Sequence, residues 1–437
     1  MLSTFQNIFK IPELRKRILF TIVMVIVYRL GSFIPTPGVD ARALSLFFST
    51  QTKGLLGLVD MFSGGALSKF SVFALGIMPY ISTSIIISLL TVVIPQLEQL
   101  QREGEAGRKK INQYTRYGTI FLCVMQGFFT SFWLQKQNVG GLPVVFNPGI
   151  GFQLTAIITL TAGTVFLMWI GEQITEYGIG NGISFIIFAG IVDRIPRAIV
   201  GTFRLLRVGQ LNIFTLGFVL AVAAVTIIGA IFIEQGVRKI PVQYARHIVG
   251  RKVYGGQSTY LPLKVDMSGV IAVIFAISVL MIPAFITQVL PFKFLQSFVK
   301  WFQNGGILYT LLYAGLIIFF CYFYTAIVFN PTDVAENMKK YGGFIPGVRP
   351  GKPTAEHIDR IIMRITLIGA LAVAAIAVVP DIFQRRFNVP FDFGGTALLI
   401  VICVALDTMK QVESHLLMRH YEGFMKKGRL VGRSTRF

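Results

Sequence analysis

Residues 54–95 read GLLGLVDMFSGGALSKFSVFALGIMPYISTSIIISLLTVVIP, and the rest of the chain is organised around this stretch. It is apolar enough to sit in a lipid bilayer, but Gly64 and Gly65 interrupt it early and Pro79 interrupts it again. Four polar or charged residues lie near the first break: Asp60, Ser63, Ser68 and Lys69. Irregular backbone at membrane depth is tolerated where it is buried in protein or lines a water-filled cavity. We therefore expect a short apolar segment folded back into a cavity, and a spanning helix at about 71–94 that lines the cavity.

The composition is that of a membrane protein. Of the 437 residues, 54% are hydrophobic and only 14% are charged, whereas a soluble domain carries roughly 25% charged residues. The net charge of +21 is first explained by basic loops that are retained in the cytoplasm. The three cysteines lie in apolar segments, and neither they nor the four histidines show a disulfide or metal spacing. We expect no cofactor and no metal.

The hydrophobic pattern predicts an all-α polytopic membrane protein with ten transmembrane helices and one re-entrant segment. The expected spans are about 18–34, 71–94, 117–134, 152–170, 183–200, 213–233, 270–289, 307–329, 361–379 and 395–405, the last extending up to Met409. Ten spans place both termini on one side, and most Lys and Arg residues fall on that side. Both termini are therefore expected in the cytoplasm. One loop is an exception, because Arg194, Arg197, Arg204 and Arg207 fall outside.

The spans divide into two halves of five. We expect an N-terminal half at 1–205 and a C-terminal half at 206–437, the latter with polar loops at about 234–264 and 330–357 and a basic tail. The fifth and tenth spans each follow a glycine-rich turn, in GIGNGISFII and FGGTALLIVI. Two repeats of five spans in one chain must be inverted relative to each other, which places a working site at the interface between the halves.

Ionisable residues are nearly absent from the spans. Arg29, Glu172, Glu234 and Asp407 lie near helix ends and are most simply interfacial. No proton relay, nucleophile constellation or phosphate-binding GxxxxGK[ST] motif is present. The chain is therefore not expected to be an enzyme, and energy from ATP must come through a partner. An inverted-repeat secondary transporter of a small solute is the alternative function, which the missing intramembrane charges disfavour.

Isoleucine recurs in four spans, in ISTSIIISLL, ISFIIF, VIAVIFAISV and LLIVI. Such residues pack a core or face lipid, or they form a dry constriction that blocks ions by dewetting. Periodicity alone leaves both interpretations open.

Two polar loops are strongly basic. The first contains Arg238, Lys239, Arg246 and Arg251, and the second contains Arg349 and Lys352. Retention of the loops in the cytoplasm accounts for such charge, and docking of a partner is the sharper interpretation. Arg349 stands between Pro346-Gly347 and Pro350-Gly351, and proline restricts the backbone. A guanidinium presented on a stiff tip suits phosphates or carboxylates on a large partner.

Six motifs spread over nearly the whole chain, in order, resemble the SecY family of channel subunits of the bacterial protein translocase. They are MFSGGALSKFSVFALGIMPYISTSIII, EGEAGRKKINQYTRYGT, GEQITEYGIGNGIS, QSTYLPLKVDMSGVI, FIPGVRPGKPT and VPFDFGGTALLIV. The resemblance implies a clamshell of two five-helix halves around a pore that conducts unfolded secretory chains and releases transmembrane segments sideways into lipid.

The resemblance also implies roles for particular residues. The plug falls on Asp60, Met61, Phe62, Ser63, Gly64, Gly65, Ala66 and Leu67. The pore ring falls on Ile77, Ile81, Ile187, Ile274 and Ile400. A lateral gate between the second and seventh spans, with the third and eighth alongside, includes Ser82 and Gln126.

The implied partners are the SecE and SecG subunits, the SecA ATPase, and the ribosome with its rRNA. Secretory preproteins and their signal sequences are the implied cargo, and the implied location is the bacterial inner membrane. The basic loops are the implied docking surface, with Arg349 as its principal residue.

Overall fold

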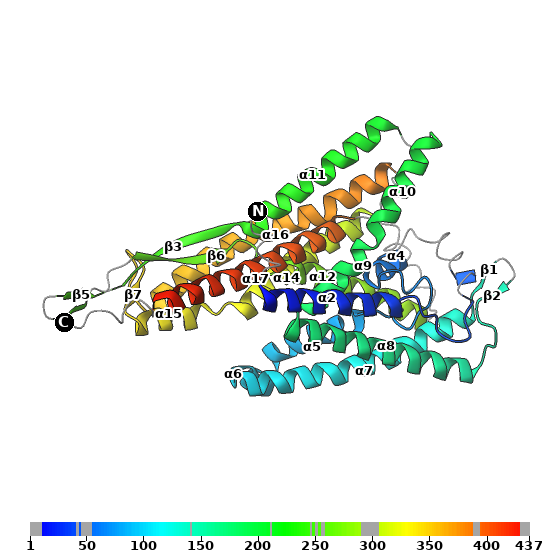
Figure 1. The fold of residues 1–437 in the computed structure, drawn as a ribbon, viewed down its shortest axis with the longest axis horizontal. Coiled ribbons are helices and arrows are strands. Elements are labelled where there is room, and N and C mark those ends of the chain that lie inside the picture. The colour runs from blue at the N-terminus through cyan, green and yellow to red at the C-terminus, as the bar shows by residue number, and fades with distance from the viewer. Residues whose placement is uncertain are drawn as a thin grey trace. The chain divides into compact units, whose positions relative to one another are not determined.

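Helices make up most of the described chain (Figure 1). The computed structural model describes residues 11–40, 43–44, 55–139, 142–209, 212–244, 247–249, 252–254, 258–289, 306–387 and 394–428. The helices are α2 (Pro12–Gly31), α4 (Leu55–Phe62), α5 (Met78–Val93), α6 (Pro95–Arg102), α7 (Glu105–Gln135), α8 (Ile150–Tyr177), α9 (Gly182–Val192), α10 (Arg194–Arg207), α11 (Ile213–Gln235), α12 (Val270–Val289), α14 (Ile307–Val328), α15 (Pro331–Lys340), α16 (Lys352–Phe387) and α17 (Gly395–Gly428). The strands are β1 (Asn138–Val139), β2 (Leu142–Pro143), β3 (Val237–Tyr244), β4 (His247–Val249), β5 (Lys252–Tyr254), β6 (Ser258–Lys264) and β7 (Gly343–Phe344).

Each predicted span falls on a helix. By length and composition alone, six helices are able to cross a membrane, or seven if the bent pair α5 and α6 counts as one span, among the described residues. The bend of 100° between α5 and α6 lies at Ile94, directly before Pro95. A residue before proline is pushed away from helical geometry, so the sequence itself ends α5 there.

Three boundaries differ from the sequence-based expectation. The span expected at 71–94 begins only at Met78, because Pro79 lies in the first turn of α5 rather than interrupting a helix. The span expected at 183–200 is broken at Asp193, which ends α9 before α10 begins. The last helix, α17, runs well past Met409 to Gly428.

The chain divides into two compact units. Unit 1 comprises Met1–Arg197, Pro283–Ser297 and Val404–Phe437, and unit 2 comprises Ala198–Ile282 and Phe298–Cys403. In unit 1, α7 and α8 lie side by side, and α5 packs on α7 (Figure 1). Small residues allow this approach: a Cβ added at Gly118 of α7 would lie 2.5 Å from Thr83 of α5.

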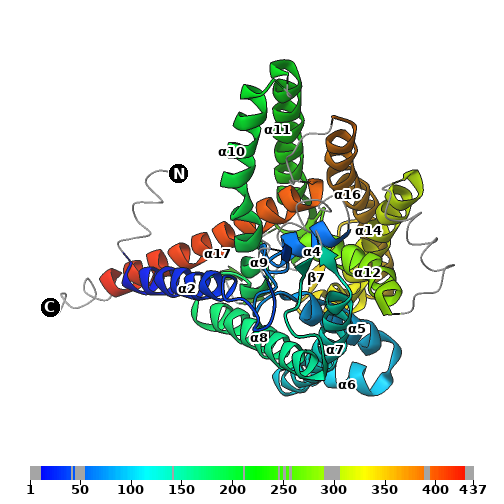
Figure 2. The same ribbon diagram turned by 90° about the vertical axis from the view of Figure 1, so that its right-hand side faces the viewer.

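Unit 2 combines a helix group with a small sheet. Helix α16 packs against both α11 and α14 and lies between them in Figure 2. The polar loop after α11 is a β-hairpin, in which β3 pairs antiparallel with β6 from Val237–Lys264 to Gln243–Ser258. Strand β7 joins the other edge of β3. The buried face of this sheet, with Ile240 and Val242, packs against Ile358 and Ile362 of α16.

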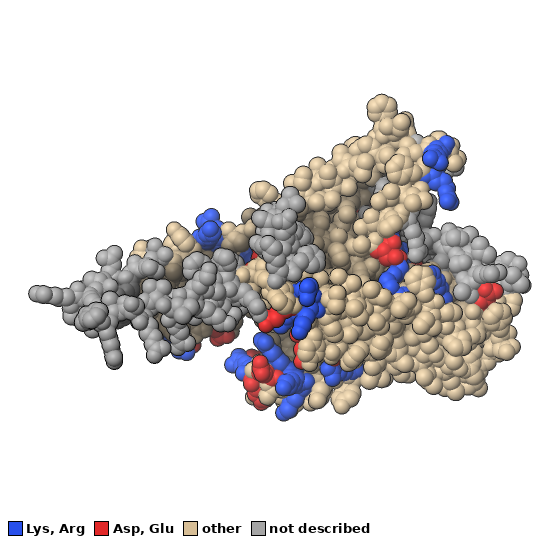
Figure 3. All heavy atoms as spheres, viewed as in Figure 1, with Lys and Arg blue, Asp and Glu red and all other residues tan. Residues whose placement is uncertain are grey.

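Charged side chains are concentrated at particular places on the surface. Figure 3 shows Lys, Arg, Asp and Glu gathered where α6 meets α7, whereas the surface over α7 and α8 is mostly uncharged. The residues at that junction are exposed, and they include Glu98, Arg102, Arg108, Lys109 and Lys110. A helix pair with an apolar flank and charged ends is the arrangement that a lipid bilayer requires.

Candidate functional site

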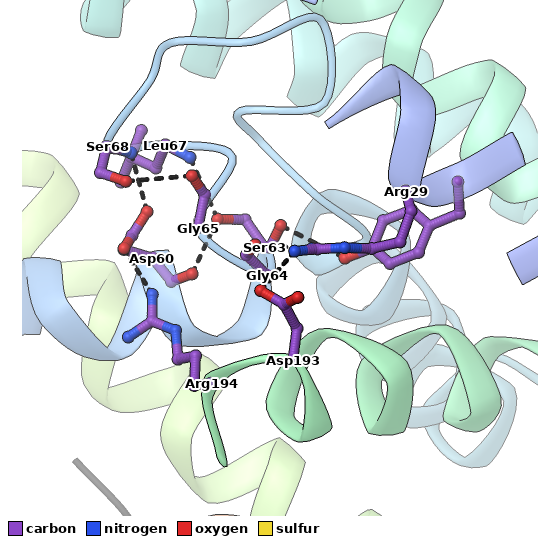
Figure 4. Close-up of polar contacts among 10 residues, drawn as sticks. Arg29, Asp60, Ser63, Gly64, Gly65, Leu67, Ser68, Asp193 and Arg194 are labelled. Atoms are coloured by element: carbon purple, nitrogen blue, oxygen red, sulfur yellow. Dashed lines mark hydrogen bonds and ion pairs between the residues drawn. The ribbon is translucent and has the colours of Figure 1, made fainter. Parts of the chain in front are cut away.

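The interrupted stretch folds as one turn-rich segment held together by its own polar groups. Helix α4 ends at Phe62, and turns follow up to Ile77. Asp60 organises the turns: its Oδ1 accepts a hydrogen bond of 2.7 Å from the backbone N–H of Ser68, and its carbonyl accepts one of 2.8 Å from Gly65 (Figure 4). The hydroxyl of Ser63 accepts from the N–H of Leu67 at 3.2 Å. Backbone groups of the segment are therefore paired partly with its own polar groups, as a non-helical segment at membrane depth requires.

Two glycines let this segment turn and approach α9. Gly64 and Gly65 have φ of +66° and +79°, a region that side chains with a Cβ rarely adopt. A Cβ on Gly64 would lie 2.5 Å from the hydroxyl of Tyr28 and 3.1 Å from the Cα of Gly190 in α9. A Cβ on Gly65 would meet nothing within 4 Å. Gly64 is therefore required both by the turn and by close packing, and Gly65 by the turn alone.

Three charged side chains lie around the segment, and a fourth, Asp60, belongs to it. Arg194 Nη2, at the start of α10, forms an ion pair with Asp60 Oδ2. Arg29 Nη2, in the last turn of α2, forms an ion pair with Asp193 Oδ2. Arg29 Nη1 also donates a hydrogen bond of 3.1 Å to the carbonyl of Gly64 (Figure 4). The hydroxyl of Tyr28 donates to the carbonyl of Ser63 at 3.3 Å. Two positive and two negative side chains thus join α2, the segment and the α9–α10 junction.

The apolar side chains of the segment are buried. Met61, Phe62, Ala66 and Leu67 are each less than a tenth exposed. The backbone beyond the segment is tied to the chain after α2, because the N–H of Val72 donates to the carbonyl of Ile34 at 2.9 Å. The residues expected to form the plug, Asp60 to Leu67, are therefore a compact element in unit 1, and we call them the plug segment.

The isoleucines expected to form the pore ring are all buried. Ile77, Ile81 and Ile187 belong to unit 1, where Ile77 precedes α5, Ile81 lies in its first turns and Ile187 lies in α9. Ile274 in α12 and Ile400 in α17 belong to unit 2. The ring stays a prediction.

The lateral-gate residues are half-buried on different helices, Ser82 on α5 and Gln126 on α7. Within the described part of the chain no hydrogen bond joins them. Their role also stays a prediction.

The basic loops present several of their cations outward. Arg238 and Lys239 on β3 are exposed, as are Arg349 and Lys352. Arg246 and Arg251 lie outside the described residues. Arg349 sits in a defined turn after β7: the N–H of Val348 donates to the carbonyl of Ile345 at 3.1 Å, and the buried hydroxyl of Thr354 donates to the carbonyl of Arg349 at 2.8 Å. The backbone at Arg349 is fixed by α16 while its side chain is exposed.

Sequence reasoning missed the residues that hold the plug segment. Arg29 was expected to be merely interfacial, and Arg194 was an unexplained exception to the charge rule. Each is instead paired with a carboxylate that the folded chain brings near. The one available signal was the placement of two cations near helix ends on the side where cations are not expected.

The other residues expected at the interface behave differently from one another. Glu172 pairs with Arg116 of α7 at 2.6 Å. Glu234 is buried, and the Sγ of Cys403 donates to its Oε2 at 3.8 Å. Asp407 is exposed. The position of these residues at the membrane interface stays a prediction.

These features define a class of protein: a polytopic α-helical membrane protein with a broken, re-entrant segment seated among its helices. Within the described residues no group of three or more His, Cys, Asp or Glu side chains is placed to hold a metal ion.

The comparisons with known proteins give the family. The SecY family model matches residues 71–409. The chain is 49% identical to the protein translocase subunit SecY of Escherichia coli K12, over 96% of each chain. It is 46% identical to that of Thermotoga maritima, over 99% of this chain and all of the relative. The chain belongs to the SecY family.

Solved structures share the fold. A structure described as a protein-conducting channel matches with a TM-score of 0.62 at 16% identity, covering 93% of this chain and 96% of the other. Sec61 in a canine ribosome-channel complex matches with a TM-score of 0.58 at 15% identity, over the same shares.

Proposed function

We propose that this chain is the protein-conducting subunit of a bacterial translocase, in which Asp60–Leu67 is a plug that closes the path at rest. The observation that carries the proposal is the seating of this segment: it is internally hydrogen-bonded, buried on its apolar side and joined to its surroundings by a few polar contacts. An element of this kind is able to leave with its internal turns intact once its contacts to Tyr28, Arg29 and Arg194 are broken. Membership of the SecY family supports the same function.

The chemistry of the channel follows from the residues assigned to its ring. Unfolded chains vary in every side chain, so a path for them needs no specific polar site. Ile77, Ile81, Ile187, Ile274 and Ile400 supply branched apolar side chains that close around varied cargo and exclude ions by dewetting. A seam containing Ser82 and Gln126 lets a segment of about 20 apolar residues pass into lipid. Residues 1–205 and 206–437 form the two halves that separate along this seam.

The channel is passive, so a partner supplies the driving energy. The exposed cations Arg349, Lys352, Arg238 and Lys239 suit an acidic protein surface or rRNA phosphates. We assign these residues, with Arg246 and Arg251, to the docking of SecA and the ribosome. SecE and SecG complete the complex in the inner membrane, with both termini of this chain in the cytoplasm.

A crosslink tests the function. A photoreactive residue at Ile81 is combined with a secretory chain stalled halfway through a reconstituted translocase. We expect an adduct between the two that is absent when the chain lacks a signal sequence. An adduct at Ser82 or Gln126 without one at Ile81 would show that the proposed position of the pore axis is wrong. No adduct at any of the three, together with uptake of a small solute into vesicles, would favour the secondary transporter instead.

A further inference from the structure

Among the described residues, the plug segment (Asp60 to Leu67) forms one ion pair with the rest of unit 1, between Asp60 and Arg194. We propose that the ion pair between Asp60 and Arg194 is a latch that holds the plug segment in its seat, alongside a separate hydrogen bond from Arg29 to the carbonyl of Gly64. The proposal rests on the proposed function, because a latch has a purpose only if the segment leaves its seat.

Asp60 links Arg194 to the backbone of the turn, because its carboxylate contacts both. One carboxylate oxygen accepts the 2.7 Å hydrogen bond from the N–H of Ser68, and the other pairs with Arg194 (Figure 4). The carboxylate cannot swing toward or away from Arg194 without disturbing the turn at Ser68. A pull on Arg194 is therefore transmitted to the backbone of the turn.

The second pair has a different task. Arg29 and Asp193 both lie outside the plug segment, so their ion pair survives when the segment leaves. Asp193 instead fixes the guanidinium of Arg29 so that Nη1 faces the carbonyl of Gly64, to which it donates at 3.1 Å. A guanidinium has several donors in a rigid plane, so it is able to serve both acceptors at once.

Burial makes the first pair the stronger of the two. The side chains of Asp60 and Arg194 are 9% and 16% exposed, against 21% and 27% for Arg29 and Asp193. Solvent screens a less exposed pair less, and an unpaired charge left in such a place is costly. When the segment leaves, both Asp60 and Arg194 must gain water or new partners. This requirement raises the free energy needed for the segment to leave its seat.

The position of Arg194 along the chain gives the latch a trigger. Arg194 is the first residue of α10, and the chain passes from unit 1 to unit 2 within this helix, between Arg197 and Ala198. The latch therefore ties the plug segment to α10, which contains one of the places where the chain passes from one unit to the other. A displacement of the first turn of α10 would act on Arg194, and through it on Asp60.

The test compares variants of one contact in the complete translocase. Leu67→Cys places a thiol in the plug segment at a position that is 7% exposed. The rate at which a soluble maleimide labels this thiol in detergent reports how often the segment leaves its seat. The three native cysteines are buried, and the chain without Leu67→Cys gives the background rate.

Four variants are combined with the Leu67→Cys reporter. Arg194→Gln and Asp60→Asn each remove one charge, and Asp60→Asn keeps an oxygen for the N–H of Ser68. Arg194→Lys keeps the charge. Arg207→Gln, at an exposed arginine of the same helix, is the matched control.

We expect the labelling rate to rise about tenfold in each single neutral variant. A tenfold change corresponds to about 1.4 kcal/mol, which lies within the usual range of coupling energies between contacting side chains. Arg194→Lys should restore most of the slow labelling, and Arg207→Gln should leave it unchanged. The double variant Asp60→Asn with Arg194→Gln should label no faster than the faster single variant, because both break the same contact. The double variant also avoids an unpaired buried charge, so it guards against misfolding of the single ones.

Labelling that stays slow in both single variants and in the double variant would overturn the latch. Labelling rates that multiply in the double variant would also overturn it, because the two side chains would then act independently. Protein translocation by the wild-type chain is measured in the same preparation. A wild type that translocates no protein would overturn the proposed function, whereas an active wild type with unchanged variants would overturn the latch alone.

Discussion

The plug segment and the basic turn at Ile345–Gly351 both depend on arginine, and they use it in opposite ways. At the plug segment, Arg29 and Arg194 are mostly buried and paired with carboxylates of the same chain. At the basic turn, Arg349 is exposed, and the described part of the chain gives it no carboxylate partner. Paired and buried cations fix internal geometry, whereas a cation on a rigid, exposed backbone is left for another molecule. Charge alone therefore does not distinguish the two roles, but burial and pairing do.

Reversing the charge of the basic turn should give the largest effect. Arg349→Glu should lower ATPase-driven translocation about a hundredfold. The substituted carboxylate would repel the acidic surface that Arg349 is proposed to attract. The measurement is the amount of preprotein protected in vesicles that contain SecA. Lys340→Glu, at an exposed position of α15, is the control and should change translocation little. Equal effects of the two substitutions would mean that total charge matters, and not the turn.

A methyl group at the plug segment should give the next effect. Gly64→Ala should raise the resting ion conductance of the reconstituted channel about tenfold. Backbone strain and the steric clash together should destabilise the seated segment by about 1.4 kcal/mol, which corresponds to a tenfold change in an equilibrium. The added Cβ would lie 2.5 Å from the hydroxyl of Tyr28.

Gly65→Ala is the matched control for this clash. It also has a positive φ, but its Cβ would meet nothing within 4 Å. The conductance of Gly65→Ala should rise much less. A rise as large as that of Gly64→Ala would mean that backbone strain causes the effect. The close approach of Gly64 to α9 would then not contribute to it.

Polar substitution of the ring should give a smaller leak while the plug stays seated. Ile77→Ser combined with Ile187→Ser should raise resting conductance several-fold, because a gap lined by hydroxyl groups is wetted. Both isoleucines are about 1% exposed. Ile86→Ser, at an exposed position of α5, is the control. Unaltered conductance in the double variant would mean that the plug segment, and not the isoleucine ring, blocks ions in the resting channel.

Loosening the basic turn should give the smallest effect. Thr354→Val keeps the shape of the side chain and removes the 2.8 Å hydrogen bond to the carbonyl of Arg349. One neutral hydrogen bond contributes about 1 kcal/mol, so SecA should bind roughly fivefold more weakly. Binding of labelled SecA to vesicles measures this effect. Unchanged binding would show that the rigidity of the turn does not matter for docking.

The sequence by itself determined the class of the protein and the place of each span. Long apolar segments have one stable solution in a bilayer, so the helices are found where the pattern placed them. The break at Gly64-Gly65 also marked where α4 gives way to turns, because such residues have no use in a simple span. The sequence placed helix ends less well: Pro79 begins α5, and the fifth span is broken at Asp193, because both depend on local capping.

Only the tertiary structure decided which charges hold the plug segment. Arg29, Asp60 and Arg194 are far apart in the sequence, and nothing in their local pattern pairs them. Their pairing depends on helix packing that brings Gly64 against Gly190, and so places the end of α2 and the start of α10 beside the same turn. A hydrophobic pattern records which residues avoid water, but it does not record which distant polar groups meet once water has been excluded.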